Sequence, residues 1–206
     1  MSDTRNTPMG NNGPRLGILG GTFDPPHLGH LIVADQVLHA LSLTEVIFVP
    51  ANEPWQKVGR RKITSAEKRL EMTRAAVGTS AGLSVSDIEL EISGPSYMSV
   101  TLEALAERRD ADEWLVIVGA DAAAGLDTWH NPDRLREQAT IVVVNRPGAD
   151  FQPPTGWSWE LVEIPSIAIS GTALRRRVAQ GNSIRFLTPE PVIDLITKWN
   201  LYRDDG

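Results

Sequence analysis

Two histidines, His27 and His30, and the glycine turn before them form the part of this sequence best suited to phosphate chemistry. Gly20 and Gly21 open the turn, and glycine lets the backbone approach a ligand closely. The histidines stand three residues apart at a predicted helix start, so they face the same way, and Gly29 leaves room between them. The N–H groups and partial positive charge of a helix start favour an anion. The turn therefore predicts a phosphate site.

Other phosphate and metal motifs do not fit this turn. Gly17, Gly20 and Gly21 do not give the G-x-G-x-x-G pattern of dinucleotide sites, and the Gly-Lys-Ser/Thr of a P-loop is missing. The histidines lack the H-E-x-x-H spacing of zinc proteases, and the chain has no cysteine for a thiolate zinc site or a nucleophile. Taken singly, a glycine turn or a histidine at a helix start is common, so the prediction depends on the joint pattern.

A second candidate anion site precedes a run of arginines at residues 175–177. Ser170 and Thr172 stand just before it, where serine or threonine is an ordinary helix N-cap. Three arginines in the first helical turn would oppose the helix dipole, and a bound anion would remove that conflict. Two interpretations stay open, a plain cap or an anion site that includes Arg175, with Arg176 and Arg177 facing solvent.

The expected elements alternate between strands and helices along most of the chain. Apolar runs predict strands at 16–19, 46–50, 83–88, 114–119, 141–144 and 161–164, and periodicity predicts helices at 28–41, 65–77, 98–109 and 132–138. Continuous β-branched runs favour a doubly wound parallel α/β sheet. Ligands bind outside the carboxyl ends of such strands. Gly119 and Asp121 follow one strand end, where Asp121 is either a ligand contact or a helix N-cap.

Length and composition indicate one domain. The chain has 206 residues, and we expect residues 15–206 to fold together, with a C-terminal helical part at about 165–203 and a disordered leader at 1–14. A net charge of −6 argues against a nucleic-acid partner. Neither a signal peptide nor an apolar run long enough for a membrane span is recognisable. These features fit a cytoplasmic protein and leave open whether it is a homo-oligomer.

Several motifs in the same order resemble the HxGH nucleotidyltransferases, and within them the bacterial nicotinate-mononucleotide adenylyltransferases of NAD biosynthesis. The resemblance covers nearly all of residues 15–202 and is carried by the histidine turn and four further segments. These segments are Pro54-Trp55-Gln56-Lys57, similar to actinobacterial members; Asp87-Ile88-Glu89-Leu90 with Gly94-Pro95-Ser96-Tyr97; Gly119-Ala120-Asp121-Ala122 with Trp129; and Ile169-Ser170-Gly171-Thr172-Ala173-Leu174-Arg175. The resemblance implies a Rossmann-like nucleotidyltransferase fold and transfer of AMP from ATP to nicotinate mononucleotide.

The resemblance also implies roles for individual residues. His27, His30 and Arg175 would be the catalytic residues. ATP would be bound by Gly20, Gly21, Thr22, Phe23, His27, His30, Gly119, Asp121, Ser170, Thr172 and Arg175. The mononucleotide would be bound by Lys57, Ser96, Tyr97 and Trp129, although a tryptophan can also be simple core. Mg²⁺ would be held mainly by the ATP phosphates, without a metal site built from protein ligands.

The chain departs from the family pattern where relatives often read P-S-Y-T-x-D-T. Met98 and Val100 replace the threonine and the aspartate. That segment helps to form the pyridine pocket in similar enzymes, so a nicotinamide mononucleotide acceptor stays open beside nicotinate. The sequence is also compatible with a phosphopantetheine-type transferase and with a nucleotide-binding module of weak activity.

Overall fold

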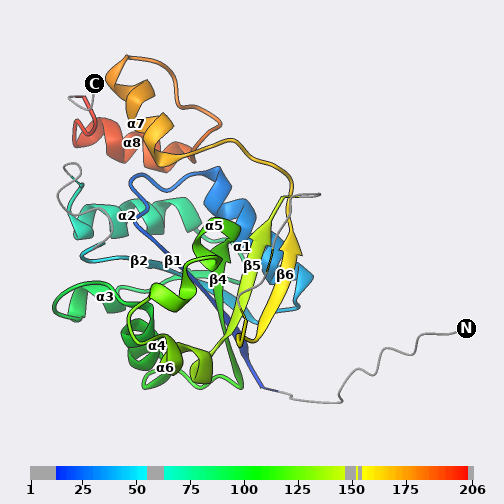
Figure 1. Ribbon diagram of the computed structural model, residues 1–206. Helices are drawn as coiled ribbons and strands as arrows, with labels where there is room; N and C mark the ends of the chain where they lie inside the picture. Colours follow the sequence, from blue (N-terminus) through cyan, green and yellow to red (C-terminus); the bar gives the residue numbers. More distant parts are fainter. Residues whose placement is uncertain (1–12, 55–62, 147–151, 153–154, 204–206) are drawn as a thin grey trace, which may run out of the picture.

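The computed structural model describes residues 13–54, 63–146, 152 and 155–203 (Figure 1). Strands and helices alternate as expected. The elements in chain order are β1 (Arg15–Gly21), α1 (Leu28–Ala40), β2 (Glu45–Pro50), α2 (Ala66–Val77), β3 (Leu83–Val85), α3 (Ile88–Glu91), α4 (Met98–Ala106), β4 (Glu113–Gly119), α5 (Ala120–Ala123), a 3-10 turn (Leu126–Thr128), α6 (Pro132–Gln138), β5 (Thr140–Asn145), β6 (Trp159–Glu163), α7 (Gly171–Ala179) and α8 (Glu190–Lys198).

The six strands form one parallel sheet in the order β3-β2-β1-β4-β5-β6. This order confirms the predicted doubly wound fold. The connections reverse direction between β1 and β4, and a crevice forms at the carboxyl ends of the strands at such a reversal. The two turns that follow β1 and β4 are therefore the parts of the chain that the fold offers to a ligand.

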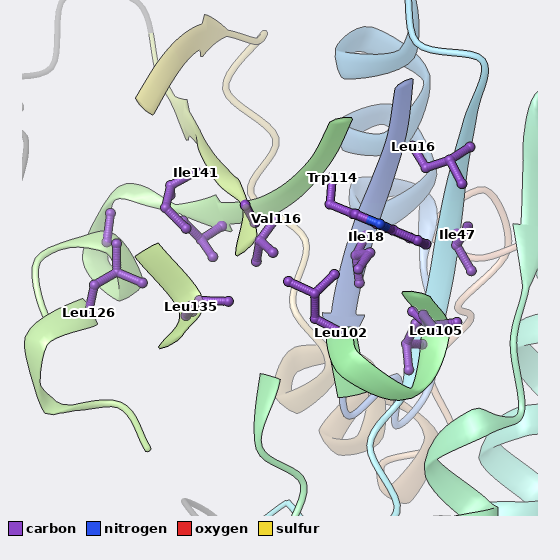
Figure 2. Packing of buried hydrophobic residues seen from close by; sticks show 14 of the residues in the cluster. Leu16, Ile18, Ile47, Leu102, Leu105, Trp114, Val116, Leu126, Leu135 and Ile141 are labelled. Carbon is purple, nitrogen blue, oxygen red and sulfur yellow. The ribbon is translucent and has the colours of Figure 1, made fainter. Parts of the chain in front are cut away.

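Side chains of the central strands alternate between two apolar clusters, one on each face of the sheet. Ile18 and Val116 belong to the cluster that contains Leu102 and Leu105 of α4. Figure 2 shows these leucines projecting toward the strand side chains. The alternate strand residues, such as Phe48 and Ile117, pack with α1 on the opposite face. Because both faces are buried, the strands read as continuous apolar runs in the sequence.

The C-terminal helices pack against α2. Met72 of α2, Leu174 of α7 and Ile196 of α8 lie in a third apolar cluster, which also includes Tyr202. In Figure 1, α7 and α8 (orange and red) lie close to α2 and far from α4 and α6. None of the helices in the described part of the chain is long and apolar enough to cross a membrane.

The predicted bounds differ most from the structure at two places. The strand expected at 83–88 ends at Val85, because the chain turns there: Ile88 N–H donates to Ser86 Oγ (3.2 Å), and Ile88 begins α3. The helix expected to reach residue 109 ends at Ala106. The expected leader lies mostly outside the described residues, although Pro14 accepts a hydrogen bond from Asp112 N–H (2.9 Å) and so borders the sheet.

Candidate functional site

The turn between β1 and α1 stacks the two histidine rings. The ring centroids of His27 and His30 lie 3.6 Å apart at an interplanar angle of 19°. The edge of Phe23 contacts the His30 ring, with centroids 4.9 Å apart at 82°. The backbone N–H of His27 donates to His30 Nδ1 (3.2 Å). A neutral His30 therefore carries its hydrogen on Nε2, which makes that atom a donor.

His27 is buried and electrically neutral at pH 7. It is the N-cap residue of α1, and burial lowers the pKa of His27 from 6.5 to about 4. Its Nδ1 has no hydrogen-bond partner within the described residues. Gly29 lies against this ring: a Cβ at Gly29 would meet His27 Nδ1 at 3.1 Å and Cε1 at 3.2 Å. Gly29 was expected to leave room for the histidines. The short distances support this expectation for His27, whose ring lies close to Gly29.

The start of α1 is less open to an anion than its sequence suggested. Leu28 N–H donates to Leu187 O (3.0 Å), and His30 N–H donates to His27 O (2.9 Å). Thr188 reinforces this contact, because its hydroxyl donates to Pro26 O (2.8 Å). Two of the first N–H groups of the helix are therefore already satisfied by the protein, and the side chains of the turn become more important for binding phosphate.

Two cavities flank the crevice between β1 and β4. The larger has a volume of about 660 Å³ and the smaller about 320 Å³. They share lining residues from the ends of β1 and β4 and from α5, namely Leu19, Ile117, Val118, Gly119 and Ala122. The two cavities are therefore neighbours across a common wall at the reversal of the sheet.

The larger cavity brings together His27, His30, Gly119 and Asp121, which were predicted to bind ATP. Sequence reasoning missed much of the remaining wall, which includes Val33, Val144, Asn145, Arg146 and an apolar segment after β6 (Ile164, Pro165, Ile167 and Ile169). The position of this segment, just past a strand of the parallel sheet, is the signal that could have found it.

The smaller cavity brings together Ser96, Tyr97 and Trp129, which were predicted to bind the mononucleotide, with Gly20, Gly21 and Thr22 from the turn, which were predicted to bind ATP. Sequence reasoning missed Glu89 and His130. Glu89 is buried, and its carboxylate is in hydrogen-bond contact with the hydroxyl of Thr101. His130 stacks on Tyr97, with centroids 4.1 Å apart at 17°.

Met98, one of the two departures from the family pattern, also lines the smaller cavity. Its side chain lies over Gly20, where a Cβ would stand 2.7 Å from Met98 Cε. A side chain at position 20 would therefore require the flexible end of this methionine to shift. Val100, the second departure, is not among the residues that line either cavity.

The three arginines lie at other positions along helix α7 than the sequence suggested. The helix begins at Gly171, so the prediction of arginines in its first turn was wrong: Arg175 lies in the second turn, while Arg176 and Arg177 lie in the last. There they interact favourably with the dipole. Ser170 is an N-cap, since its Oγ accepts from Ala173 N–H (3.2 Å).

Arg175 is buried against the histidine turn. Its Nη1 donates to Asp24 O (2.8 Å) and its Nη2 to Thr172 Oγ1 (3.3 Å). The carboxylate of Asp24 accepts a hydrogen bond from Tyr202 Oη (2.6 Å), and burial together with this carboxylate raises the pKa of Tyr202. Arg175, Thr172 and Ser170 line neither cavity, although Ile169 beside them lines the larger one.

Phe23 and Lys57 were also predicted to bind substrate. Phe23 lines neither cavity, because its ring is buried against His30 and Phe48; its backbone φ is +47°, an uncommon value for an aromatic residue. Lys57 lies outside the described residues. Within those residues no cluster of three or more His, Asp or Glu side chains could hold a metal ion.

Fold and site together define a nucleotidyltransferase. A family model described as cytidylyltransferase-like matches residues 18–177. A solved structure of the Plasmodium falciparum nicotinic acid mononucleotide adenylyltransferase complexed with NaAD superposes with a TM-score of 0.73, covering 92% of this chain and 98% of that chain at 20% identity. This likeness concerns the fold.

Curated relatives narrow the class. The probable nicotinate-nucleotide adenylyltransferase of Exiguobacterium sibiricum is 43% identical over 188 residues, covering 91% of this chain and 98% of the relative. That of Corynebacterium kroppenstedtii is 42% identical over 199 residues, covering 95% and 94%. The chain belongs to the nicotinate-nucleotide adenylyltransferase family of cytidylyltransferase-like enzymes. The predicted activity is thereby confirmed.

Proposed function

We propose that the larger cavity holds ATP and the smaller cavity holds nicotinate mononucleotide, so that AMP passes between them across the end of β1. The observation that carries this proposal is that most expected side chains for the two substrates line different cavities, although Gly20, Gly21 and Thr22, also expected to bind ATP, line the smaller cavity. The expected ATP side chains His27, His30 and Asp121 line only the larger cavity, and the expected mononucleotide residues Ser96, Tyr97 and Trp129 line only the smaller one. The wall that they share is where a transferred phosphorus would lie.

The reaction needs positioning and charge stabilisation more than proton transfer. The 5'-phosphate oxygen of nicotinate mononucleotide attacks the α-phosphorus of ATP. The bond to the bridging oxygen breaks, and pyrophosphate leaves with the electron pair, giving nicotinate adenine dinucleotide. A phosphate monoester has a second pKa near about 6, so the nucleophile is already largely ionised at neutral pH. The protein must then bring two anions together and stabilise the charge that develops.

The histidine stack supplies a donor for that charge. His30 Nε2 carries a hydrogen because its Nδ1 accepts from the backbone of His27. Phe23 and His27 contact the His30 ring on two sides and hold its orientation. A donor fixed in this way needs little reorganisation as the reaction proceeds. His27 enters the reaction neutral, and an approaching phosphate would favour its protonation.

Arg175 would act on the ATP phosphates from its position beside the histidine turn. Its guanidinium binds Asp24 O and Thr172 Oγ1, so its charge lies between the histidine turn and the start of α7. We therefore assign Arg175 to the electrostatic stabilisation of the ATP phosphates, together with the N-terminal N–H groups of α7 near Ser170 and Thr172. Lys57 is proposed as a phosphate contact on the mononucleotide side.

Mg²⁺ fits this site as a companion of ATP. The described residues offer no three-carboxylate or histidine cage. Mg²⁺ commonly keeps several waters and binds through substrate phosphates with few protein ligands. Asp121, an exposed carboxylate on the larger cavity, is the side chain that would face such an ion or its waters. When bound, the ion neutralises charge on the pyrophosphate.

The experiment measures pyrophosphate release from ATP and Mg²⁺ with nicotinate mononucleotide, nicotinamide mononucleotide and phosphopantetheine in parallel. We expect release with the nicotinate substrate and much slower release with the other two. Trp129→Ala should raise the KM for the mononucleotide and leave the KM for ATP unchanged. Trp159→Ala is the control, because Trp159 lies on β6 outside both cavities. Equal KM changes for the two substrates would contradict the assignment of the cavities.

A further inference from the structure

Arg69 of α2 is a buried cation whose guanidinium binds backbone carbonyls from three segments. Only 1% of the residue is exposed. Its Nε donates to Thr64 O (2.8 Å), its Nη1 to Thr22 O (2.9 Å) and Ala51 O (2.6 Å), and its Nη2 to Asn52 O (3.1 Å). Removing a guanidinium from water is costly unless its donors are satisfied. Four backbone carbonyls of the described residues accept hydrogen bonds from Arg69, which indicates that this buried charge fixes the position of the backbone around it.

The carbonyls belong to the carboxyl edge of the sheet. Thr22 follows β1 in the histidine turn, and Ala51 and Asn52 follow β2. Ala51 N–H also donates to Gly21 O (2.9 Å), which extends the β1–β2 pairing into the turn. Thr64 precedes α2. Arg69 therefore joins the turn after β1 to the chain that leaves β2, directly behind the smaller cavity that Thr22 and Ala51 line.

A carbonyl that faces Arg69 fixes the direction of the next N–H. In a trans peptide the C=O and the following N–H point in opposite directions, and Asp24–Pro25 is the only cis peptide in the described chain. Asn52 O faces Arg69, and accordingly the N–H of Glu53 points away and donates to Ser96 Oγ (3.1 Å). Arg69 thus aims a backbone donor at a residue of the smaller cavity.

The same geometry applies to Thr22 and Phe23. Thr22 O faces Arg69, so the N–H of Phe23 is directed away from Arg69. Phe23 has a φ of +47°, a conformation that persists only where the surroundings enforce it. The bond from Arg69 to the preceding carbonyl is one such restraint. The strained residue lies between the cavity-lining glycine turn and the stacked histidines.

We propose that Arg69 is a positioning residue for nucleotidyl transfer, which acts by turning the N–H of Phe23 outward as a donor to the transferred phosphate. The inference rests on the proposed assignment of the two cavities. Arg69 itself does not touch substrate. Its fork-shaped guanidinium spans several carbonyls at once, which the single ammonium of lysine cannot do with the same geometry.

The first experiment compares Arg69→Lys with Arg74→Lys. Arg74 lies on the same helix, is half exposed and pairs with Asp87, so the control makes the same chemical change outside the site. We expect Arg69→Lys to lower kcat per folded molecule at least tenfold, with KM values changed less, while Arg74→Lys matches the unmodified enzyme. A merely structural role would reduce the folded fraction, measured by circular dichroism, and leave kcat per folded molecule intact; that result would overturn the proposal.

The second experiment uses the unmodified protein, so it decides the matter even if Arg69→Lys does not fold. Thr precedes Phe only at Thr22-Phe23, and the chain has four Phe residues. Labelling Thr carbonyl carbon with ¹³C and Phe nitrogen with ¹⁵N therefore isolates the Phe23 amide. We expect its proton resonance to move downfield with AMP, which carries the transferred phosphate, and an unmoved resonance at saturation would overturn the proposal. Pyrophosphate release by the unmodified enzyme, measured in parallel, separates this failure from a failure of the proposed function.

Discussion

The buried neutral His27 predicts a specific dependence of stability on pH. Its pKa is about 4 in the folded protein, against 6.5 when exposed. Between these values the unfolded chain binds a proton that the folded protein does not, so stability falls as pH decreases through this window. Each pKa unit corresponds to about 1.4 kcal/mol, so the loss is about 2 kcal/mol at pH 5 and approaches about 3 kcal/mol near pH 4.

Replacing His27 by Asn removes the titrating group and should flatten this dependence. The assay is urea unfolding at pH 7.5, 6 and 5, followed by circular dichroism. The difference in unfolding free energy between His27→Asn and the unmodified protein should shift by about 2 kcal/mol in favour of the variant from pH 7.5 to 5. His39→Asn is the control, because His39 lies on the same helix with a side chain that is 72% exposed. Parallel curves for His27→Asn and the unmodified protein would refute the reasoning.

Three further substitutions test the turn around the histidines. His30→Ala should lower kcat by about 10²–10³, as loss of one charge-stabilising donor does, with the circular dichroism spectrum unchanged; normal turnover in a folded variant would remove His30 from the mechanism. Gly29→Ala places a Cβ 3.1–3.2 Å from the His27 ring, so kcat should fall more than the KM for ATP changes in steady-state kinetics. Tyr202→Phe removes the donor to the buried Asp24 carboxylate and should cost about 1–3 kcal/mol in urea unfolding; an unchanged midpoint would show that this bond contributes little.

The sheet was predictable because its signal is local. Strands buried on both faces have apolar side chains at every position, and β4 and β5 are such runs. The turn after β1 was predictable for a related reason, since Gly20, Gly29 and the two histidines act within a few residues of one another. The end of β3 was not predictable in this way. The alternating pattern of the sequence continues after Val85, beyond the point at which the chain turns into α3.

The role that we propose for Arg69 was not predictable, because it depends on carbonyls from segments up to 47 residues away. The sequence carries one hint. Arg69 shares the buried face of α2 with Met72, Thr73 and Ala76, at spacings of three, four and seven residues. A charged residue on an otherwise uncharged, buried helical face must find partners inside the fold, yet helical periodicity does not identify those partners.

The same reasoning explains why the motif did not reveal the geometry of the turn. Among the side chains that lie far from the turn in sequence and contact it, Arg69 binds Thr22 O, Arg175 binds Asp24 O, and Tyr202 binds the Asp24 carboxylate. They come from α2, α7 and the end of the described chain, so the turn acquires its shape only when these elements have packed. Arg175 was expected to reach an anion through the start of its own helix. Its contact with Asp24 couples its charge to the turn, so the role that we propose for Arg175 would make the packing of the C-terminal helices against α2 a condition for catalysis as well as for stability.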